Sequence, residues 1–221
     1  MIAGTHWRPD RLLIADDDFP LPPDLDIPID RVDTERLAEL CGSREHQGAA
    51  ARLPPYPMNT VASLLARSPQ RVVVLDRIQY ANNFGTILRS AEVFGFDGCL
   101  IADRGQCGVT AAIGRLSAGA VFRVPIAQTG ELAAAIGQLR EAGIVCWSTS
   151  PEAGTRCSET DFGSRAAIVI GAEHDGVQPA IAAACDGTVT IPQIGQTQSL
   201  NAASSAAVLM YEIARRSGSA G

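Results

Sequence analysis

The sequence predicts an α/β domain whose sheet is mainly parallel and is covered by helices on both faces. Two observations support this fold class. From Arg71 onward, short apolar runs rich in β-branched residues alternate with stretches of helical periodicity. Most of the runs are apolar over their whole length, as in strands that helices bury on both sides, and strands separated by helices usually pair in parallel.

The elements are expected in strict alternation along the chain. Strands are expected over the apolar runs at residues 72–75, 99–102, 121–126, 144–147, 167–170 and 188–191. Helices are expected between them at residues 86–94, 111–118, 131–141, 179–184 and 201–216. Sheets of this kind bind ligands outside the carboxyl ends of their strands, so a site is expected at that edge.

The start of the chain has a different composition and predicts a small N-terminal module over residues 1–53. Its first 45 residues contain eleven carboxylates and five arginines, and so carry the whole net charge of −6. A short helical pattern covers residues 34–40. The prolines that follow favour extended backbone, and we expect a linker over residues 54–70 before the main domain at 71–221.

Composition limits the possible partners. All 18 lysine or arginine residues are arginine, which suits bidentate phosphate binding but is explained better by a coding bias. The net negative charge argues against a nucleic-acid partner, but the argument is weakened because the net charge is confined to the N-terminal residues. The six cysteines form no Cys-x-x-Cys pair, so we interpret them as reduced and expect no metal. The chain has no apolar run near the roughly 18 residues of a membrane span and no signal-peptide layout, so a cytoplasmic protein without membrane contact is expected.

Three polar stretches, at residues 82–89, 171–176 and 191–201, lie at the ends of predicted strands. Each has a simple structural interpretation. Asn83 and either Ser199 or Asn201 are the residue types that cap helices, Arg89 and Glu173 can be ordinary helix charges, and the single loop residue His174 gives no reason to assign catalysis. Together, however, the stretches predict one small-molecule site of Asn, Arg, Glu, Ser and Asn side chains.

Common enzyme motifs are missing from the sequence. It contains no Gly-x-Gly-x-x-Gly opening a helix, no Gly-x-x-x-x-Gly-Lys and no Gly-x-Ser-x-Gly. These patterns are typical of dinucleotide oxidoreductases, P-loop proteins and α/β-hydrolases respectively. All three classes therefore lose support, and a small-molecule oxidoreductase has no motif behind it.

At residues 71–216 the sequence resembles the SpoU (TrmH-like) family of SPOUT RNA 2′-O-ribose methyltransferases, with all three family motifs in order. The first resembles Asn83-Phe84-Gly85 through Arg89, the second Gly171-Ala172-Glu173 with Gly176, and the third Ile191-Pro192 with Ser199-Leu200-Asn201. His46-Gln47-Gly48 is similar to a stretch that, in relatives, joins an N-terminal ribosomal-protein-like RNA-binding domain to the catalytic domain. With some 45 residues before it, that RNA-binding domain is expected to be truncated or degenerate here.

The resemblance implies a deep trefoil knot at the C-terminal end, a homodimer, the cofactor S-adenosylmethionine, and methyl transfer to a ribose 2′-hydroxyl of ribosomal or transfer RNA. It implies that the cofactor is bound by Gly171, Ile191, Leu200 and Thr149. It implies that the catalytic surface is formed by Asn83, Arg89, Glu173, Ser199 and Asn201. Whether Arg89 orients the substrate or removes a proton stays open.

The sequence also departs from the family pattern. Ala202-Ala203 stand where a valine and a serine usually follow the third motif, and Gln193 replaces a usual methionine. A non-catalytic RNA-binding factor with the same fold is therefore the alternative function. Target choice is expected to depend on the N-terminal module and on surface arginines, namely Arg77, Arg104, Arg115 and Arg123.

Overall fold

The computed structural model describes residues 7–21, 23, 25–197 and 199–217. The chain divides into two compact units, one ending at Pro57 and the other beginning at Met58. Each unit has its own sheet.

The N-terminal unit contains a three-stranded sheet in the order β2-β1-β3. Strand β1 (Arg11–Ile14) lies in the centre, parallel to β2 (Ile29–Arg31) and antiparallel to β3 (Ala49–Arg52). Helix α1 (Thr34–Cys41) begins where the Asp33 side chain accepts a hydrogen bond from the Arg36 N–H and ends at Gly42, whose φ of 63° suits glycine. The helix confirms the periodicity at 34–40, whereas the three strands, each only three or four residues long, were not predicted.

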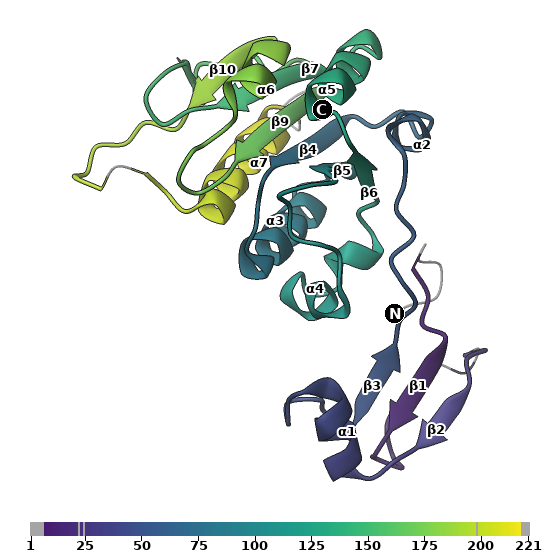
Figure 1. Ribbon diagram of the computed structural model, residues 1–221. Helices are drawn as coiled ribbons and strands as arrows, with labels where there is room; N and C mark the ends of the chain where they lie inside the picture. The colour runs from purple at the N-terminus through teal and green to yellow at the C-terminus, as the bar shows by residue number, and fades with distance from the viewer. Residues whose placement is uncertain (1–6, 22, 24, 198, 218–221) are drawn as a thin grey trace. The chain divides into compact units, whose positions relative to one another are not determined.

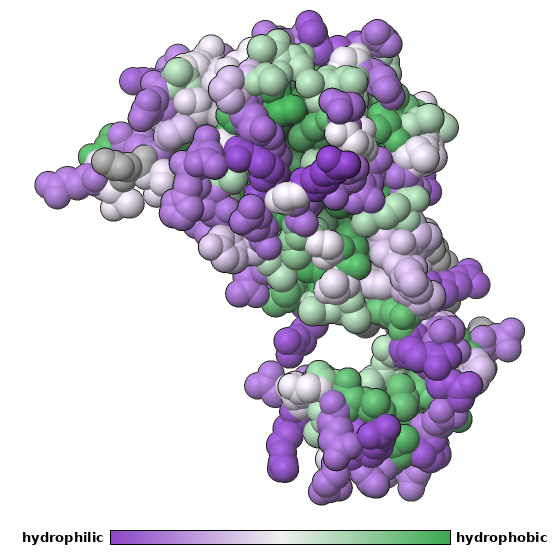
Figure 2. Space-filling view, viewed as in Figure 1, coloured by the Kyte–Doolittle hydropathy of each residue, from purple (hydrophilic) through white to green (hydrophobic). Residues whose placement is uncertain are grey.

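A small core holds this unit together. Trp7, Ile14 and Leu37 are buried, and the Trp7 ring packs edge-on against Tyr56 with the centroids 5.0 Å apart. The Trp7 indole N–H also donates to the Pro54 carbonyl at 2.9 Å, which ties the start of the unit to its last residues. Figure 2 shows the outside of the unit as hydrophilic around a smaller hydrophobic area, in keeping with its many charges.

The second unit contains the predicted parallel sheet, in the order β6-β5-β4-β9-β7-β10-β8. Figure 1 labels all of these strands except β8. Every registered strand pair in it is parallel. Its strands are β4 (Arg71–Asp76), β5 (Gly98–Ala102), β6 (Ile126–Thr129), β7 (Val145–Thr149), β8 (Thr155–Arg156), β9 (Ala166–Gly171) and β10 (Gly187–Thr190). In this order β7 lies between β9 and β10. Because all three strands are parallel, their carboxyl ends lie at the same edge of the sheet.

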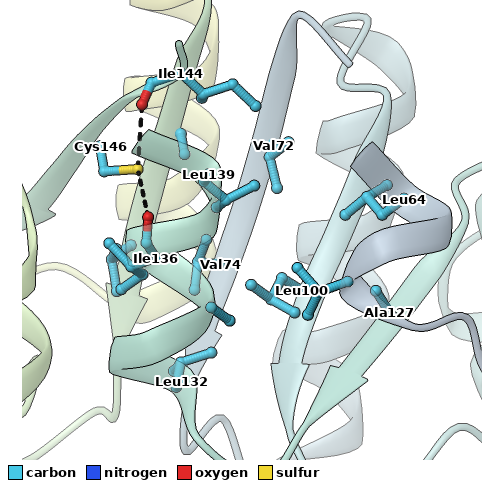
Figure 3. Packing of buried hydrophobic residues seen from close by; sticks show 14 of the residues in the cluster. Leu64, Val72, Val74, Leu100, Ala127, Leu132, Ile136, Leu139, Ile144 and Cys146 are labelled. Carbon is cyan, nitrogen blue, oxygen red and sulfur yellow. Dashed lines mark hydrogen bonds between the residues drawn. The ribbon is translucent and has the colours of Figure 1, made fainter. Parts of the chain in front are cut away.

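Helices cover both faces of this sheet, as predicted. They are α2 (Val61–Leu65), α3 (Ala81–Val93), α4 (Ala111–Leu116), α5 (Leu132–Glu141), α6 (Pro179–Ala184) and α7 (Ala202–Ser217), with a 3-10 turn at Ala120–Phe122. On one face α2, α5 and α6 bury alternate strand residues, and Figure 3 shows Leu132, Ile136 and Leu139 of α5 packed toward Val72 and Val74 of β4. On the other, α7 contacts both β9 and α3.

The structure corrects three details of the predicted elements. The run at 121–126 is not one strand, because Val121 and Val124 are buried in and after the 3-10 turn and β6 begins only at Ile126. Within the expected linker at 54–70, α2 forms and its Val61 and Leu64 join the core of the second unit. Helix α3 begins at Ala81 rather than Thr86, which places the whole first motif inside the helix.

This earlier start changes the role of Gly85. A glycine just before a predicted helix suggests a close backbone turn, but Gly85 lies inside α3, where it is buried against α4. A Cβ at this position would lie 2.5 Å from the Leu116 Cβ and 2.9 Å from the Leu116 carbonyl carbon. Glycine therefore permits the close approach of two helices rather than a turn.

Candidate functional site

A chain of hydrogen bonds joins the three polar stretches. The Asn201 Nδ2 group donates to Asn83 Oδ1 at 3.1 Å, and the Asn83 Nδ2 group donates to Glu173 Oε1. Asn83 lies in the first turn of α3, Glu173 follows β9, and Asn201 immediately precedes α7. Residues 90 and 118 positions apart in the sequence thus meet at the carboxyl edge of the sheet.

The direction of this chain is set by the end of Asn201 that caps α7. Its Oδ1 accepts hydrogen bonds from the N–H groups of Ala203 at 2.9 Å and Ser204 at 3.4 Å. Because an amide has one acceptor end and one donor end, only Nδ2 is left to face Asn83, and Asn83 in turn presents its own Nδ2 to the Glu173 carboxylate. The predicted cap at Asn201 exists, and it also orients the site.

Glu173 reaches this position because the chain folds back tightly after β9. A Cβ at Gly171 would lie 2.1 Å from the Gly176 carbonyl carbon, so no larger residue fits there. The Gly176 N–H donates to the Ala172 carbonyl at 2.9 Å, and Gly176 itself has a φ of 65°. Glu173 therefore lies at the start of a tight loop and bonds Asn83, instead of serving the next helix.

A cavity of about 620 Å³ opens beside Glu173, at the ends of β7, β9 and β10. Its volume lies within the range of small-molecule sites. All four predicted cofactor residues line it, namely Gly171, Ile191, Leu200 and Thr149. Of the predicted catalytic residues, Glu173 and Ser199 line it as well. Their roles stay predictions, and the Thr149 hydroxyl is already engaged, since it donates to the Val169 carbonyl at 2.8 Å.

Arg89 and Ser199 are not joined to the hydrogen-bonded chain. Both side chains are exposed, and neither has a hydrogen-bond or ion-pair partner among the residues that the structure describes. Arg89 lies on the solvent side of α3, three residues after Thr86 and four before Val93, which are also exposed. Its guanidinium is therefore available to an anionic ligand.

Two of the four surface arginines expected to select RNA are already paired. Arg77 lies 3.3 Å from an Asp76 oxygen and 3.1 Å from an Asp175 oxygen, and Arg123 lies 2.9 Å from a Glu92 oxygen. Arg104 and Arg115 are exposed and have no such partner within the described part of the chain. The expectation is thus least suited to Arg77, which is held inside a network.

The cysteines are free thiols, of which Cys99, Cys146 and Cys157 are buried. Burial raises the pKa of Cys146 to about 12, so this thiol stays protonated at neutral pH. The described residues contain no group of three or more His, Cys, Asp or Glu side chains that could hold a metal ion. Within the same residues, no helix is long and apolar enough to cross a membrane.

Sequence reasoning did not single out several residues that line the cavity. Ser150 and Val177 do so from the loops after β7 and β9, and Leu209 does so from α7. A signal existed for the first two, since both follow strands whose carboxyl ends share the predicted edge. Leu209 offered none, because a leucine inside a helix predicts only burial.

The model of the SpoU rRNA Methylase family matches residues 70–211. A Synechocystis protein named as an uncharacterized tRNA/rRNA methyltransferase is 32% identical over 195 residues, which cover 86% of this chain and 51% of that protein. A Mycolicibacterium vanbaalenii protein with the same description is 36% identical over 201 residues, which cover 89% of this chain and 62% of that protein. The chain thus spans only part of the length of these relatives.

Solved structures share the fold. The SpoU methyltransferase AviRb from Streptomyces viridochromogenes, in complex with the cofactor AdoMet, is similar with a TM-score of 0.80 and 26% identity. The similarity covers 97% of this chain and 85% of that one. An RNA 2′-O ribose methyltransferase is similar with a TM-score of 0.70 and 25% identity, covering 96% of this chain and 82% of the other.

Proposed function

The chain belongs to the SpoU rRNA Methylase family, and from this we propose that it transfers a methyl group from S-adenosylmethionine to a ribose 2′-hydroxyl of ribosomal or transfer RNA. One observation carries the proposal. Glu173 lines a cavity of suitable size and is hydrogen-bonded to Asn83, which is bonded in turn to Asn201, and each of the three comes from a different family motif. The relatives' descriptions support RNA as the substrate class.

The cavity fits a cofactor that combines a heterocycle with charged and polar groups. The backbone N–H and C=O groups of Gly171 and Ile191 offer hydrogen-bond donors and acceptors, while the Leu200 and Leu209 side chains offer apolar contact. AviRb, which has a similar fold, was solved with AdoMet bound, and this supports the same cofactor here. When bound, S-adenosylmethionine supplies a sulfonium methyl group that is already activated for displacement.

The residues of this chain mainly have to align the 2′-oxygen with that methyl group. Positioning contributes most of the rate enhancement in such a reaction, because no strong acid or base is needed to activate the methyl donor. The Asn83 amide is held in place between Asn201 and Glu173, next to the cavity that Glu173 lines. Ser199 offers a hydroxyl at the cavity wall. Arg89 is always cationic, so we assign it to orienting the substrate and stabilising the developing oxyanion.

A second copy of the chain completes the site in this proposal. The exposed faces of α3 and α7 present Val93 at 63%, Val208 at 41% and Tyr211 at 53% exposure, and Tyr211 packs edge-on against Phe94. These helices contact each other, so their apolar side chains belong to one side of the unit. Arg89 lies one turn from Val93, and a homodimer formed here would enclose it.

The remaining parts of the proposal concern the chain as a whole. We assign residues 1–53 as an RNA-binding module, 54–70 as a connection whose helix α2 packs on the second unit, and 71–221 as the methyltransferase domain. The enzyme would act in the cytoplasm, where its RNA substrates are found. The exposed arginines Arg104 and Arg115 are the better candidates for phosphate contacts.

Calorimetry and methyl transfer test the proposal in sequence. S-adenosylmethionine is titrated into the protein first, and the tritiated cofactor is then supplied with unmodified ribosomal and transfer RNA. We expect saturable binding with one site per chain, and label in one RNA class. Cofactor binding without transfer to any RNA would instead favour the alternative, a non-catalytic RNA-binding factor that keeps the fold.

A further inference from the structure

A fully buried carboxylate lies under the loop that carries Glu173. Asp76 is the last residue of β4, is 0% exposed, and pairs in register with Gly171 of β9. Its Oδ2 accepts a hydrogen bond from the Gln178 backbone N–H at 2.7 Å, and its Oδ1 accepts one from the Gln178 Nε2 group, also at 2.7 Å. One carboxylate thus holds both the main chain and the side chain of the residue that ends the loop.

Arg77 holds the middle of the same loop. Its Nε lies 3.3 Å from Asp76 Oδ1, its Nη1 donates to Asp175 Oδ2 at 3.1 Å, and its Nη2 donates to the Gly176 carbonyl at 3.4 Å. Arg77 has a φ of 62°, a left-handed conformation that costs a non-glycine residue free energy. The surrounding hydrogen bonds offset this cost.

The two loops that meet here both serve the candidate site. Residues 171–177 line the cavity and include Glu173, while the turn that begins at Asp76 leads into Asn83. A buried carboxylate is costly unless every oxygen is bonded, and an apolar residue would fill the space without that cost. The specific gain from Asp76 is a fixed geometry between the two loops.

We propose that Asp76, Arg77 and Gln178 are positioning residues that hold the 172–178 loop in the form that binds S-adenosylmethionine. The inference rests on the proposed function for the identity of the ligand. It goes beyond that function because none of the three residues belongs to the motif positions. Loss of the contacts among these three residues should weaken cofactor binding and disturb the Asn83–Glu173 contact, while the sheet itself stays folded.

The test exchanges the two partners. Asp76→Asn can replace Oδ1, which accepts from both Gln178 Nε2 and Arg77 Nε, with an NH₂ group. The Gln178 amide can turn its oxygen toward that group but Arg77 has only donors, so the contact with Arg77 is lost. The double variant Asp76→Asn/Gln178→Glu returns a carboxylate to this group of side chains, where it can accept from the NH₂ group and pair with Arg77. We expect the single variant to raise the cofactor Kd about tenfold or more and the double variant to return it to within about threefold of wild type. Gln178→Ala, which keeps the backbone bond, should raise the Kd by a smaller factor and serves if Asp76→Asn does not fold.

A control carboxylate, exposed rather than buried, lies at the other end of β4. Asp97 Oδ2 accepts hydrogen bonds from the N–H groups of Gln70 at 2.7 Å and Arg71 at 2.9 Å, so Asp97→Asn also removes a carboxylate that holds backbone at this strand. We expect it to lower the unfolding temperature without changing the cofactor Kd. Equal increases in Kd for the two variants would overturn the inference and reduce Asp76 to a stabilising role.

Amide hydrogen exchange separates this inference from the choice of ligand. Without cofactor, residues 172–178 should exchange faster in Asp76→Asn and return to wild-type rates in the double variant. If the wild-type protein binds no S-adenosylmethionine, the proposed function fails while the exchange data still report on the loop. Unchanged exchange in Asp76→Asn would overturn the inference whatever the ligand.

Discussion

At the scale of single residues, amide groups do most of the orienting in the candidate site. Asn201 uses its oxygen to cap α7 and its nitrogen to hold Asn83, so Asn201→Ala would remove both contacts, whereas Asn201→Asp would keep the capping oxygen and lose the donor to Asn83. Asn83 touches both neighbours and no backbone cap depends on it among the described contacts. It is therefore the residue at which the site can be altered with the least effect on folding.

Replacing Asn83 by alanine should reduce methyl transfer by about 100-fold, because the groups that align the substrate lose their link. The cofactor Kd should stay within about twofold of wild type, since Asn83 does not line the cavity. Steady-state kinetics and calorimetry measure the two effects. Asn82→Ala is the control, since Asn82 is an exposed neighbour in the same turn, and equal losses in both variants would refute the assignment.

For Arg89 the pH profile distinguishes orientation from proton removal. Lysine keeps the positive charge but not the planar pair of donors, so Arg89→Lys should lower the rate by a similar factor at every pH. The rate of methyl transfer is measured across the alkaline limb. A limb displaced along the pH axis would show that residue 89 itself exchanges the proton.

At the scale of helices and strands, close packing decides where α3 lies and hence where Asn83 and Arg89 are presented. Gly85 allows α3 to approach Leu116, at the end of α4. The sequence correctly predicted a helix here but not its start, because Tyr80, which precedes the first turn, makes no side-chain cap that could be recognised. A glycine in a helix is usually a weakness, and its packing role is visible only in three dimensions.

Gly85→Ala should therefore destabilise the protein by about 1–3 kcal/mol, despite the better helix propensity of alanine. The control is Gly137→Ala in α5, where a Cβ would meet nothing within 4 Å and propensity should stabilise by roughly 0.4–1 kcal/mol. Chemical denaturation of both variants measures the difference. A stabilising Gly85→Ala would contradict the packing between α3 and α4.

The end of α7 gives a pH-dependent prediction. Hydrogen bonds from Arg215 and Arg216 lower the pKa of Glu212 below its ordinary value of 4.5. A lowered pKa in the folded state means that the stabilisation is complete above pH 4.5 and is lost as the pH falls through the folded value. Glu212→Gln should thus lower the unfolding temperature at pH 7, and by less at pH 3, which lies below the ordinary value.

The comparison for this variant is Glu159→Gln, which removes an exposed ion pair 3.8 Å long. Exposed pairs contribute little, so its unfolding temperature should change little at either pH. A Glu212→Gln effect that is the same at pH 3 and pH 7 would show that packing, and not the carboxylate charge, holds the helix end.

At the scale of the whole molecule, the parallel sheet was predictable because its strands are short, apolar and separated by helices. Strand β8 was not, since its two residues are exposed and polar, and neither was the sheet of the N-terminal unit. The site was predictable in part. The positions of the motifs predicted that Asn83, Glu173 and Asn201 lie together. They could not show that Arg89 lies outside this hydrogen-bonded chain or that Asp76 is buried under the loop that carries Glu173. The trefoil knot, implied by the family resemblance, stays a prediction.

The most direct test locates the transferred methyl group. Unmodified ribosomal and transfer RNA are incubated with the protein and tritiated S-adenosylmethionine, digested to nucleosides and separated. We predict that the label is recovered in a 2′-O-methylated nucleoside and is reduced about 100-fold with Asn83→Ala. Label on a base, or cofactor binding with no label in any RNA, would contradict the proposed ribose methyltransferase.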